Sequence, residues 1–401
     1  LGGLATLGLI VIYLPLCDGN GRQVIAGISE EFLRASLKYG PGNLPDCWRE
    51  GGDPAARQQE RYQTRYEAAS LTLALEELLL SAGVTLWYDT RLCAAVCAAG
   101  RVQGVIVENK SGRLGIRAKA FVDATGDADL CYMAGEATVS LATNVRTGWY
   151  FSGGGAGVRL HQLTDPYGPN SKASRRYAGD QHWDVTQHAI DGRKMILEDL
   201  RRRQATEEQD VYPLLLPAYD GMRMTRRLSG AYTLDESEAF RDFPDSVGLT
   251  GDWRKRGPVF AIPWRSLAGV KNANLAAAGR CISVSTDMWD ITRVIPTAAM
   301  TGQAAGLGGA GRAAGGSAGF AAHRAAARGA ARQWRDCRSA LAPSKNTKPP
   351  KASDLPSGGF SYTGAKFCHM RSKMANQKRQ SLYGIAAFMC AKNWHAISQN
   401  Q

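Results

Sequence analysis

Two short apolar segments that each end in a glycine turn constrain the fold of this chain most strongly. The segment KAFVDATGD at 119–127 reads as a buried strand that ends in a Thr-Gly-Asp turn, and NLAAAGR at 274–280 repeats this design. Glycine allows the backbone N–H groups of such a turn to approach a phosphate or a ribityl chain, because a Cβ atom there would collide with the ligand. Together the two turns predict a nucleotide-binding site at the ends of two strands.

The residues around these turns predict helices and further strands. Apolar residues at helical spacing predict one long helix over 54–83. Runs of β-forming residues at 84–118, beginning with VTLWYD at 84–89, predict a meander of three or four short antiparallel strands. Two more helices are expected around 183–203 and at 294–310. The combined pattern predicts a mixed α/β protein.

The net charge of the chain lies in its C-terminal part. The sequence carries 49 Lys and Arg against 36 Asp and Glu, for a formal net charge of +13. Residues 310–401 hold 15 of the basic residues and only two acidic ones, Asp336 and Asp354, so this tail accounts for the net charge and the body is neutral. The tail lacks apolar periodicity, which predicts a disordered or out-of-frame segment. A basic arm that binds nucleic acid is the alternative.

The cysteines and the apolar content limit the class of protein. The 9 cysteines are scattered, which favours free thiols in a reduced, cytoplasmic compartment. The closest pair, Cys93 and Cys97, has neither zinc-ribbon nor ferredoxin spacing, so no metal site is predicted. No run is long and apolar enough for a membrane span, and we expect no membrane partner. Residues 1–17 are apolar without the basic residues that precede a secretory signal, and we expect the chain to begin inside a domain.

In the order and spacing of five stretches, residues 1–308 resemble the FAD-dependent oxidoreductases of the glutathione-reductase-like two-dinucleotide-binding fold. The likeness is to the group related to the flavin subunit of heterodisulfide reductase. The stretches are LGGLAT (1–6), GVIVENKSGRLGIRAKAFVDATGDADL (104–130), RMTRRLSGAYTLDESE (223–238), NLAAAGRCIS (274–283) and RVIPTAAMTGQAAG (293–306). The resemblance implies an α/β chain with a three-layer (ββα) FAD/NAD(P)-binding Rossmann-like domain.

The resemblance also implies that FAD is held in an extended pose. The first residues would lie under the flavin end, and the two glycine turns would reach the nucleotide side, the pyrophosphate and the ribityl oxygens. The helix after Arg293 would aim its N-terminus at the flavin C2 carbonyl, where negative charge gathers on reduction. The implied cofactor-binding residues are Gly2, Gly3, Thr6, Ala124, Thr125, Gly126, Asp127, Gly279, Arg280, Arg293, Gly302 and Gln303. As an alternative, the helix glycines serve only packing and Arg280 only caps a surface turn.

The sequence departs from this family at three places. The first strand-turn-helix-strand unit, with its G-x-G-x-x-G turn, does not precede LGGLAT, so we expect a unit of about 30 residues to be missing upstream. Met224 stands where relatives usually have an acidic residue, and Ala298 stands where many have Cys. Some relatives carry a [4Fe–4S] cluster, but no cysteine run in this sequence could hold one. FAD is therefore the expected cofactor.

Candidate substrate-binding residues lie in the stretch at 223–238. Guanidinium groups of Arg223, Arg226 and Arg227 can hold a carboxylate or a phosphate, and Tyr232 can transfer a proton. We take Arg226, Arg227 and Tyr232 as the candidate catalytic residues, with an interdomain salt-bridge network as the alternative role. Structural positions are expected for His161, His182, His188 and Cys281.

These observations predict an FAD-dependent oxidoreductase that transfers a hydride to or from a small-molecule substrate, with an unidentified electron donor or acceptor. The expected parts are a FAD-binding domain without its first βαβ unit at 1–149, an inserted α+β cap or substrate region at 150–260, the last part of the FAD-binding domain at 261–309 and the basic tail at 310–401. A nonfunctional fragment and a nucleic-acid-binding scaffold are the alternatives. The neutral body argues against the scaffold, and the missing first unit favours the fragment.

Overall fold

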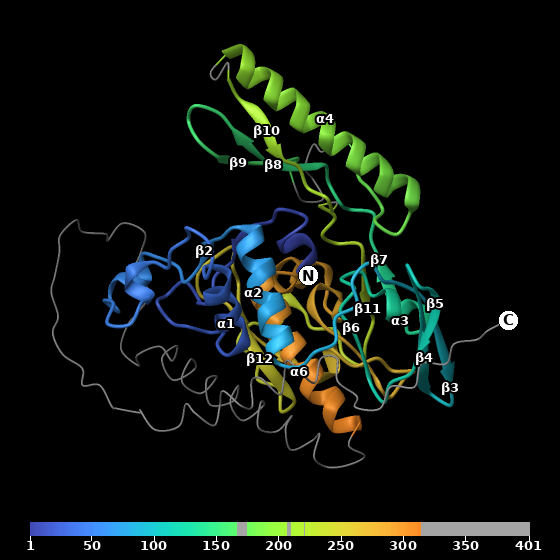
Figure 1. The fold of residues 1–401 in the computed structure, drawn as a ribbon. Coiled ribbons are helices and arrows are strands. Elements are labelled where there is room, and N and C mark those ends of the chain that lie inside the picture. The colour runs from blue at the N-terminus through green and yellow to red at the C-terminus, as the bar shows by residue number, and fades with distance from the viewer. Residues whose placement is uncertain (167–174, 207–209, 220, 314–401) are drawn as a thin grey trace.

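The computed structural model describes residues 1–166, 175–206, 210–219 and 221–313. Figure 1 shows a large body and, on one side of it, a smaller layer made of a long helix and an antiparallel sheet. From residue 314 onward, the tail predicted to be disordered lies outside the described residues. Among the helices that are described, none is long and apolar enough to cross a lipid bilayer.

The two predicted strands form a short parallel pair in the middle of the body. β6 (Phe121–Asp123) pairs with β14 (Leu275–Ala277), and Asp123 lies opposite Ala277. The apolar residues of β14 are buried because this strand is covered on both faces. Since the strands are parallel, their carboxyl ends lie side by side, and so do the glycine turns that follow them.

Helices cover one side of the parallel pair. α6 (Ile295–Ala313) packs against both β6 and β14 and against α1 (Ile28–Ser36), which in turn packs against α2 (Ala68–Ser81). The helix predicted at 294–310 is therefore confirmed, and it continues to Ala313. α6 also packs closely on the strand β12 (Ser246–Gly251), because a Cβ atom added to Gly248 of that strand would meet the side chain of Met300.

The antiparallel meander lies on the other side of the parallel pair, as Figure 1 shows. Its strands β3 (Arg91–Ala98), β4 (Arg101–Asn109) and β5 (Gly112–Ile116) pair in the order β3-β4-β5. The side chain of Asn274 joins the meander to β14, because it bonds both the N–H and the carbonyl of Val102 at 2.9 Å. Helices, parallel pair and meander are the three layers that the sequence predicts.

Two predicted elements were wrong. The helix predicted over 54–83 begins only at Ala68, because the residues before it form a 3₁₀ turn at Ala56–Gln58 and the strand β2 (Thr64–Arg65), which pairs with β1 (Ile12–Tyr13). Tyr62 and Tyr66 are buried, and their burial stabilises this non-helical conformation of the segment.

The segment 84–89 forms no strand, although a strand was predicted there. Val84 packs beside Ile28 in a small apolar cluster, whereas the next aromatic residues, Trp87 and Tyr88, are exposed. Asp89 has a φ of 48°, which ends an extended conformation. The β-forming residues of this run therefore form no strand, because β propensity depends on packing against a neighbouring strand.

The smaller layer is a three-stranded antiparallel sheet covered by a long helix. β8 (Thr147–Gly153) lies between β10 (Tyr212–Leu215) and β9 (Arg159–Thr164). The helix α4 (His182–Thr206), predicted around 183–203, packs on β8. Close approach requires glycine here, because a Cβ atom on Gly148 would lie 2.8 Å from the carbonyl oxygen of Gly192.

The remaining elements connect this layer to the parallel pair. Short helices flank the two glycine turns, and two antiparallel pairs complete the body. The helices are α3 (Asp129–Met133) and α5 (Thr286–Thr292), and the pairs are β7 (Thr138–Ser140) with β11 (Arg226–Leu228) and β12 (Ser246–Gly251) with β13 (Val259–Pro263).

Candidate functional site

The buried carboxylate of Asp123 shapes the first glycine turn. Its Oδ1 accepts hydrogen bonds from the N–H of Thr125 at 3.0 Å and from its hydroxyl at 2.7 Å, and its Oδ2 accepts from the N–H of Cys131 at 2.8 Å. Gly126 completes the turn with a φ of 87°, a conformation that favours glycine. The sequence analysis did not single out Asp123, although an Asp two residues before a Thr at a strand end is typical of an Asx turn.

The helices α5 and α6 each form a hydrogen bond to the second glycine turn. Gly279 has a φ of 76°, and its N–H donates to the hydroxyl of Thr301 in α6 at 2.9 Å. The carbonyl of Arg280 accepts a hydrogen bond from the indole N–H of Trp289 in α5. The N–H of Gly279, which the sequence predicted to contact a ligand, therefore bonds Thr301 instead. Thr301 was not among the residues predicted from the sequence.

An ion pair joins the two turns. Nη2 of Arg280 lies 2.8 Å from Oδ1 of Asp127, and both side chains are mostly buried. The Arg280 guanidinium covers Gly126, where an added Cβ atom would lie 2.8 Å from Arg280 Cζ. Burial acts to lower the pKa of Arg280, but the negative charge of Asp127 and its hydrogen bond leave this pKa above its usual value. Arg280 therefore stays a cation between the strand ends.

Arg226 braces the first turn from outside. Its Nε donates to the carbonyl of Asp127 at 2.9 Å and its Nη2 lies 2.5 Å from a carboxylate oxygen of Asp129. Its guanidinium also stacks over the ring of Tyr132, with 4.2 Å between the Cζ atom and the ring centroid. Burial and the charge of Asp127 raise the pKa of Asp129, although Arg226 acts to lower it. Arg226 is thus committed to positioning this turn.

Arg227 braces the segment that follows the second turn. Its Nε donates to the carbonyl of Val284, and its guanidinium lies over the ring of Trp289 at 4.7 Å. Burial lowers the pKa of Arg227. Its Nη1 is buried and has no hydrogen-bond partner in the described part of the chain, and the same holds for Nε of Arg280. These two N–H groups are suited to an oxygen-rich ligand, because leaving a buried donor unpaired is costly.

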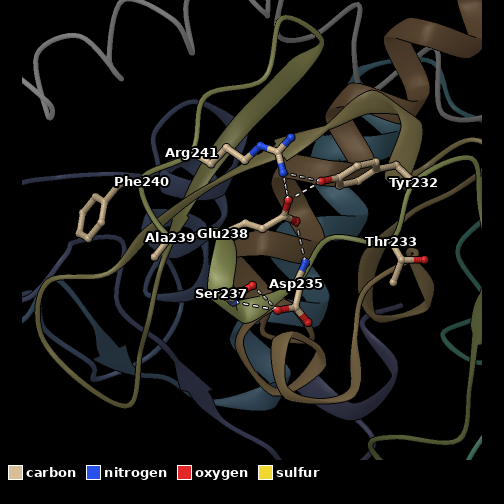
Figure 2. A pocket seen from close by; sticks show the side chains of 8 residues that line it. All are labelled: Tyr232, Thr233, Asp235, Ser237, Glu238, Ala239, Phe240 and Arg241. Atoms are coloured by element: carbon tan, nitrogen blue, oxygen red, sulfur yellow. Dashed lines mark hydrogen bonds and ion pairs between the residues drawn. The ribbon is translucent and has the colours of Figure 1, made fainter.

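Tyr232 lies apart from the arginines with which the sequence grouped it. Figure 2 shows its hydroxyl beside Glu238 and Arg241 in an open pocket. Burial and the hydrogen bond to Glu238 raise the pKa of Tyr232, so its phenol holds its proton more strongly than usual. The pocket is lined by Tyr232, Thr233, Asp235, Ser237, Glu238, Ala239, Phe240 and Arg241.

The N-terminal segment forms a tight turn at Gly2–Thr6. Gly2 and Gly3 have φ values of 78° and 49°, and a Cβ atom on Gly2 would meet the side chain of buried Thr6. The carbonyl of Leu7 accepts a hydrogen bond from the N–H of Tyr219 at 3.3 Å. This hydrogen bond joins the N-terminal loop to the segment between β10 and β11.

The predicted residues of the last helix point to different neighbours. Arg293 follows the last residue of α5, where its side chain pairs with Asp290 and its backbone N–H donates to the carbonyl of Trp289. Gln303 faces the start of α1, where its Oε1 lies 3.5 Å from the position of a Cβ atom on Gly27. Gly302 is buried within α6. The sequence grouped these three residues around one ligand, and the structure gives them separate contacts.

The histidines and Cys281 have structural contacts. His161 shares a 2.8 Å hydrogen bond with Ser152, and His188 contacts the carbonyl of Val145 at 3.1 Å. Burial raises the pKa of the Cys281 thiol, which disfavours a reactive thiolate. Within the described ranges, no group of three or more His, Cys, Asp or Glu side chains could hold a metal ion.

Comparison with known proteins identifies a family. A family model described as "FAD dependent oxidoreductase" matches residues 1–148 and 152–316. No curated protein matches. Two solved structures are similar to this chain, each with 14% sequence identity. The Diels-Alderase PyrE3 of pyrroindomycin biosynthesis has a TM-score of 0.35, and the match covers 79% of this chain and 64% of that one. BexE, studied for oxidation in BE-7585A biosynthesis, has a TM-score of 0.36, and the match covers 82% of this chain and 62% of that one. This chain spans less than two thirds of either structure.

Proposed function

Because this chain belongs to the FAD-dependent oxidoreductase family, we propose that it binds FAD without a covalent bond across its two glycine turns and oxidises or reduces a small anionic molecule. One observation carries this proposal: the ion pair of Arg280 and Asp127 holds both turns together at the carboxyl ends of a parallel strand pair. Ligands of open α/β sheets bind at such strand ends.

The residues present fit an oxygen-rich cofactor. Nε of Arg280 is a buried donor without a partner among the described residues, and a pyrophosphate or a flavin carbonyl supplies an acceptor for it. When bound, FAD supplies the ring system that accepts or gives a hydride. The chain would hold it with Gly126, Asp127 and Arg280, and α6 would direct the positive end of its helix dipole toward the flavin.

The substrate proposal rests on Arg227 more than on Arg226. Arg226 already donates to Asp127 and Asp129, so its guanidinium orients the turn. Arg227 keeps a buried Nη1 that could donate to a carboxylate or a phosphate. The proposed role of Tyr232 as a proton donor requires a substrate that extends to the pocket of Glu238 and Arg241. A closer relation to the heterodisulfide reductase flavin subunit stays a prediction from the sequence.

Flavin release tests this proposal directly. The full chain is purified after incubation with equal concentrations of FAD and FMN, washed, and heat-denatured, and the released flavin is separated and identified by its absorbance and mass. We expect FAD in a ratio near one per chain. Release of FMN, or a chain that retains no flavin while its circular dichroism is that of a folded protein, would overturn the assignment.

A further inference from the structure

The carboxyl of Asp129 lies beside the first glycine turn and is partly open to solvent. Its Oδ1 lies 2.5 Å from Nη2 of Arg226. Its Oδ2 accepts no hydrogen bond from the residues that the structure describes, and the side chain is 41% exposed. The other carboxylates of this turn are already engaged, since Asp123 holds the backbone of the turn and Asp127 pairs with Arg280. Asp129 therefore has an oxygen that a bound molecule can reach.

The backbone holds this carboxyl in place at a conformational cost. Ala128, which precedes Asp129, has a φ of 53° and a ψ of 37°, a left-handed conformation that is unfavourable for a residue with a Cβ atom. Ala128 is fully buried, so the packing around it maintains this conformation. The N–H of Asp129 also donates to the hydroxyl of Thr125 at 3.0 Å. Backbone strain of this kind is typical of functional sites, which points to a role for Asp129 beyond stability.

We propose that Asp129 is a catalytic acid–base residue, which rests on the proposed function, and that the substrate is an alcohol or the corresponding carbonyl compound. In the oxidising direction, a C–H bond of the alcohol breaks, and the hydrogen passes with its electron pair to oxidised FAD. The O–H bond breaks as well, its proton goes to Oδ2 of Asp129, and a C=O bond forms. The reducing direction returns the same proton from Asp129 to the carbonyl oxygen.

The charges around Asp129 suit a group that exchanges a proton. Burial and the negative charge of Asp127 raise its pKa, Arg226 acts to lower it, and the charge of Asp123 raises it again, so that the pKa lies above the usual 3.8. An acid–base group works best when its pKa is near the working pH, and this environment shifts Asp129 in that direction. The phenol of Tyr232, whose pKa is raised above the usual 10, is a much weaker candidate for a base.

Arg226 orients the carboxyl without blocking it. Its side chain is only 11% exposed, its Nε donates to the carbonyl of Asp127 at 2.9 Å, and its guanidinium stacks on Tyr132. These contacts fix the guanidinium, which in turn fixes Oδ1 of Asp129 and leaves Oδ2 for a ligand. A purely structural Asp129 would serve only as the counterion of Arg226. The two roles differ in what they predict for a bound flavin.

The midpoint potential of bound FAD tests the proposal without a substrate. Reduction adds negative charge to the flavin, so a carboxyl beside it binds a proton more readily, and the potential falls more steeply with rising pH where that carboxyl titrates. Between pH 4 and 8 we expect this steeper decline in the full wild-type chain and in Asp129→Glu, but not in Asp129→Asn. Asp46→Asn is the matched control, because Asp46 also pairs with an arginine but is 89% exposed, and it should follow the wild-type chain.

Carboxyl-detected NMR of the full chain without FAD gives a second readout, and we expect the pKa of Asp129 to lie above 3.8. A pKa at or below this value would overturn the proposal. So would a potential that Asp129→Asn leaves unchanged while urea unfolding shows a loss of stability, since Asp129 would then be a counterion only. A folded chain that retains no FAD would instead overturn the proposed function, and this outcome is separate because the flavin is then absent from every variant.

Discussion

Arg280 and Asp127 are separated by much of the sequence, yet Nη2 of Arg280 lies 2.8 Å from Oδ1 of Asp127. One residue follows the strand β14 and the other follows β6, so the ion pair fixes two strand ends relative to each other. Removing one partner would leave a largely buried charge without its counterion, which costs far more than an exposed ion pair contributes. The geometry of the proposed FAD site therefore depends on this contact.

Replacing Gly126 should disturb both the turn and the ion pair. Gly126→Ala places a Cβ atom at a φ of 87° and 2.8 Å from Arg280 Cζ, so we expect it to lower the free energy of unfolding by about 2 kcal/mol or more and to weaken FAD binding. Gly83→Ala is the control, because Gly83 has a φ of 72° but nothing near its Cβ position. Urea unfolding should show about 1 kcal/mol for that control, with FAD binding retained. Equal effects of the two substitutions would refute the close contact.

Replacing Asp123 should destabilise the first glycine turn. Asp123→Ala removes the acceptor for two N–H groups and one hydroxyl, and we expect a loss of about 3 kcal/mol in unfolding free energy. Asn109→Ala removes a similar turn contact, to the N–H of Ser111, at an exposed site and should cost less than about 1 kcal/mol. Chemical denaturation of both variants provides the comparison. A small loss for Asp123→Ala would mean that the turn holds its shape without the carboxylate.

Acid should weaken the smaller layer through Asp199. Burial acts to raise the pKa of this carboxyl, but hydrogen bonds from Arg203, Arg202 and Tyr150 lower it from 3.8 to about 2. A carboxyl whose pKa is lowered by folding stabilises the folded state at pH values above its pKa in the unfolded chain. This contribution is lost as the pH falls from about 4 toward 2. Asp199→Asn should therefore be less stable at pH 7 and show a shallower decline of Tm between pH 4 and 2.

Thermal melts at several pH values, followed by circular dichroism, measure this effect. Glu50→Gln serves as the control, since Glu50 is exposed and far along the sequence from α4. The control should follow the wild-type chain at every pH. A variant with Asp199→Asn whose Tm declines as steeply as that of the wild-type chain would show that another group carries the acid sensitivity.

The sequence predicted the fold well where local pattern and long-range pairing agree. The strands ending at Asp123 and Ala277, the meander and the helix α4 follow from apolar pattern and turn residues alone. The segment before Ala68 could not be predicted in this way. Its strand β2 forms through pairing with the distant strand β1, and such a pairing leaves no pattern in the local sequence.

The site could be predicted only in part for a related reason. The two glycine turns were identified from the sequence, but their ion pair was not, since a salt bridge between distant residues depends on the tertiary fold. Arg226 and Tyr232 are close in sequence and were grouped together, yet Arg226 contacts Asp127 while Tyr232 contacts Glu238. The strand β11 ends between these two residues, so their closeness in sequence does not predict that their side chains share one site.

The affinity for FAD of the wild-type chain and of Asp127→Ala tests the central claim most directly. Asp127 orients Arg280, and we expect its removal to cost about 1.5–3 kcal/mol of binding, so that the dissociation constant measured by calorimetric titration rises at least tenfold. Asp127→Asn, which keeps the size of the side chain, should lie between the two, and urea unfolding identifies variants that are folded. A folded Asp127→Ala chain that binds FAD as tightly as the wild-type chain would contradict the account.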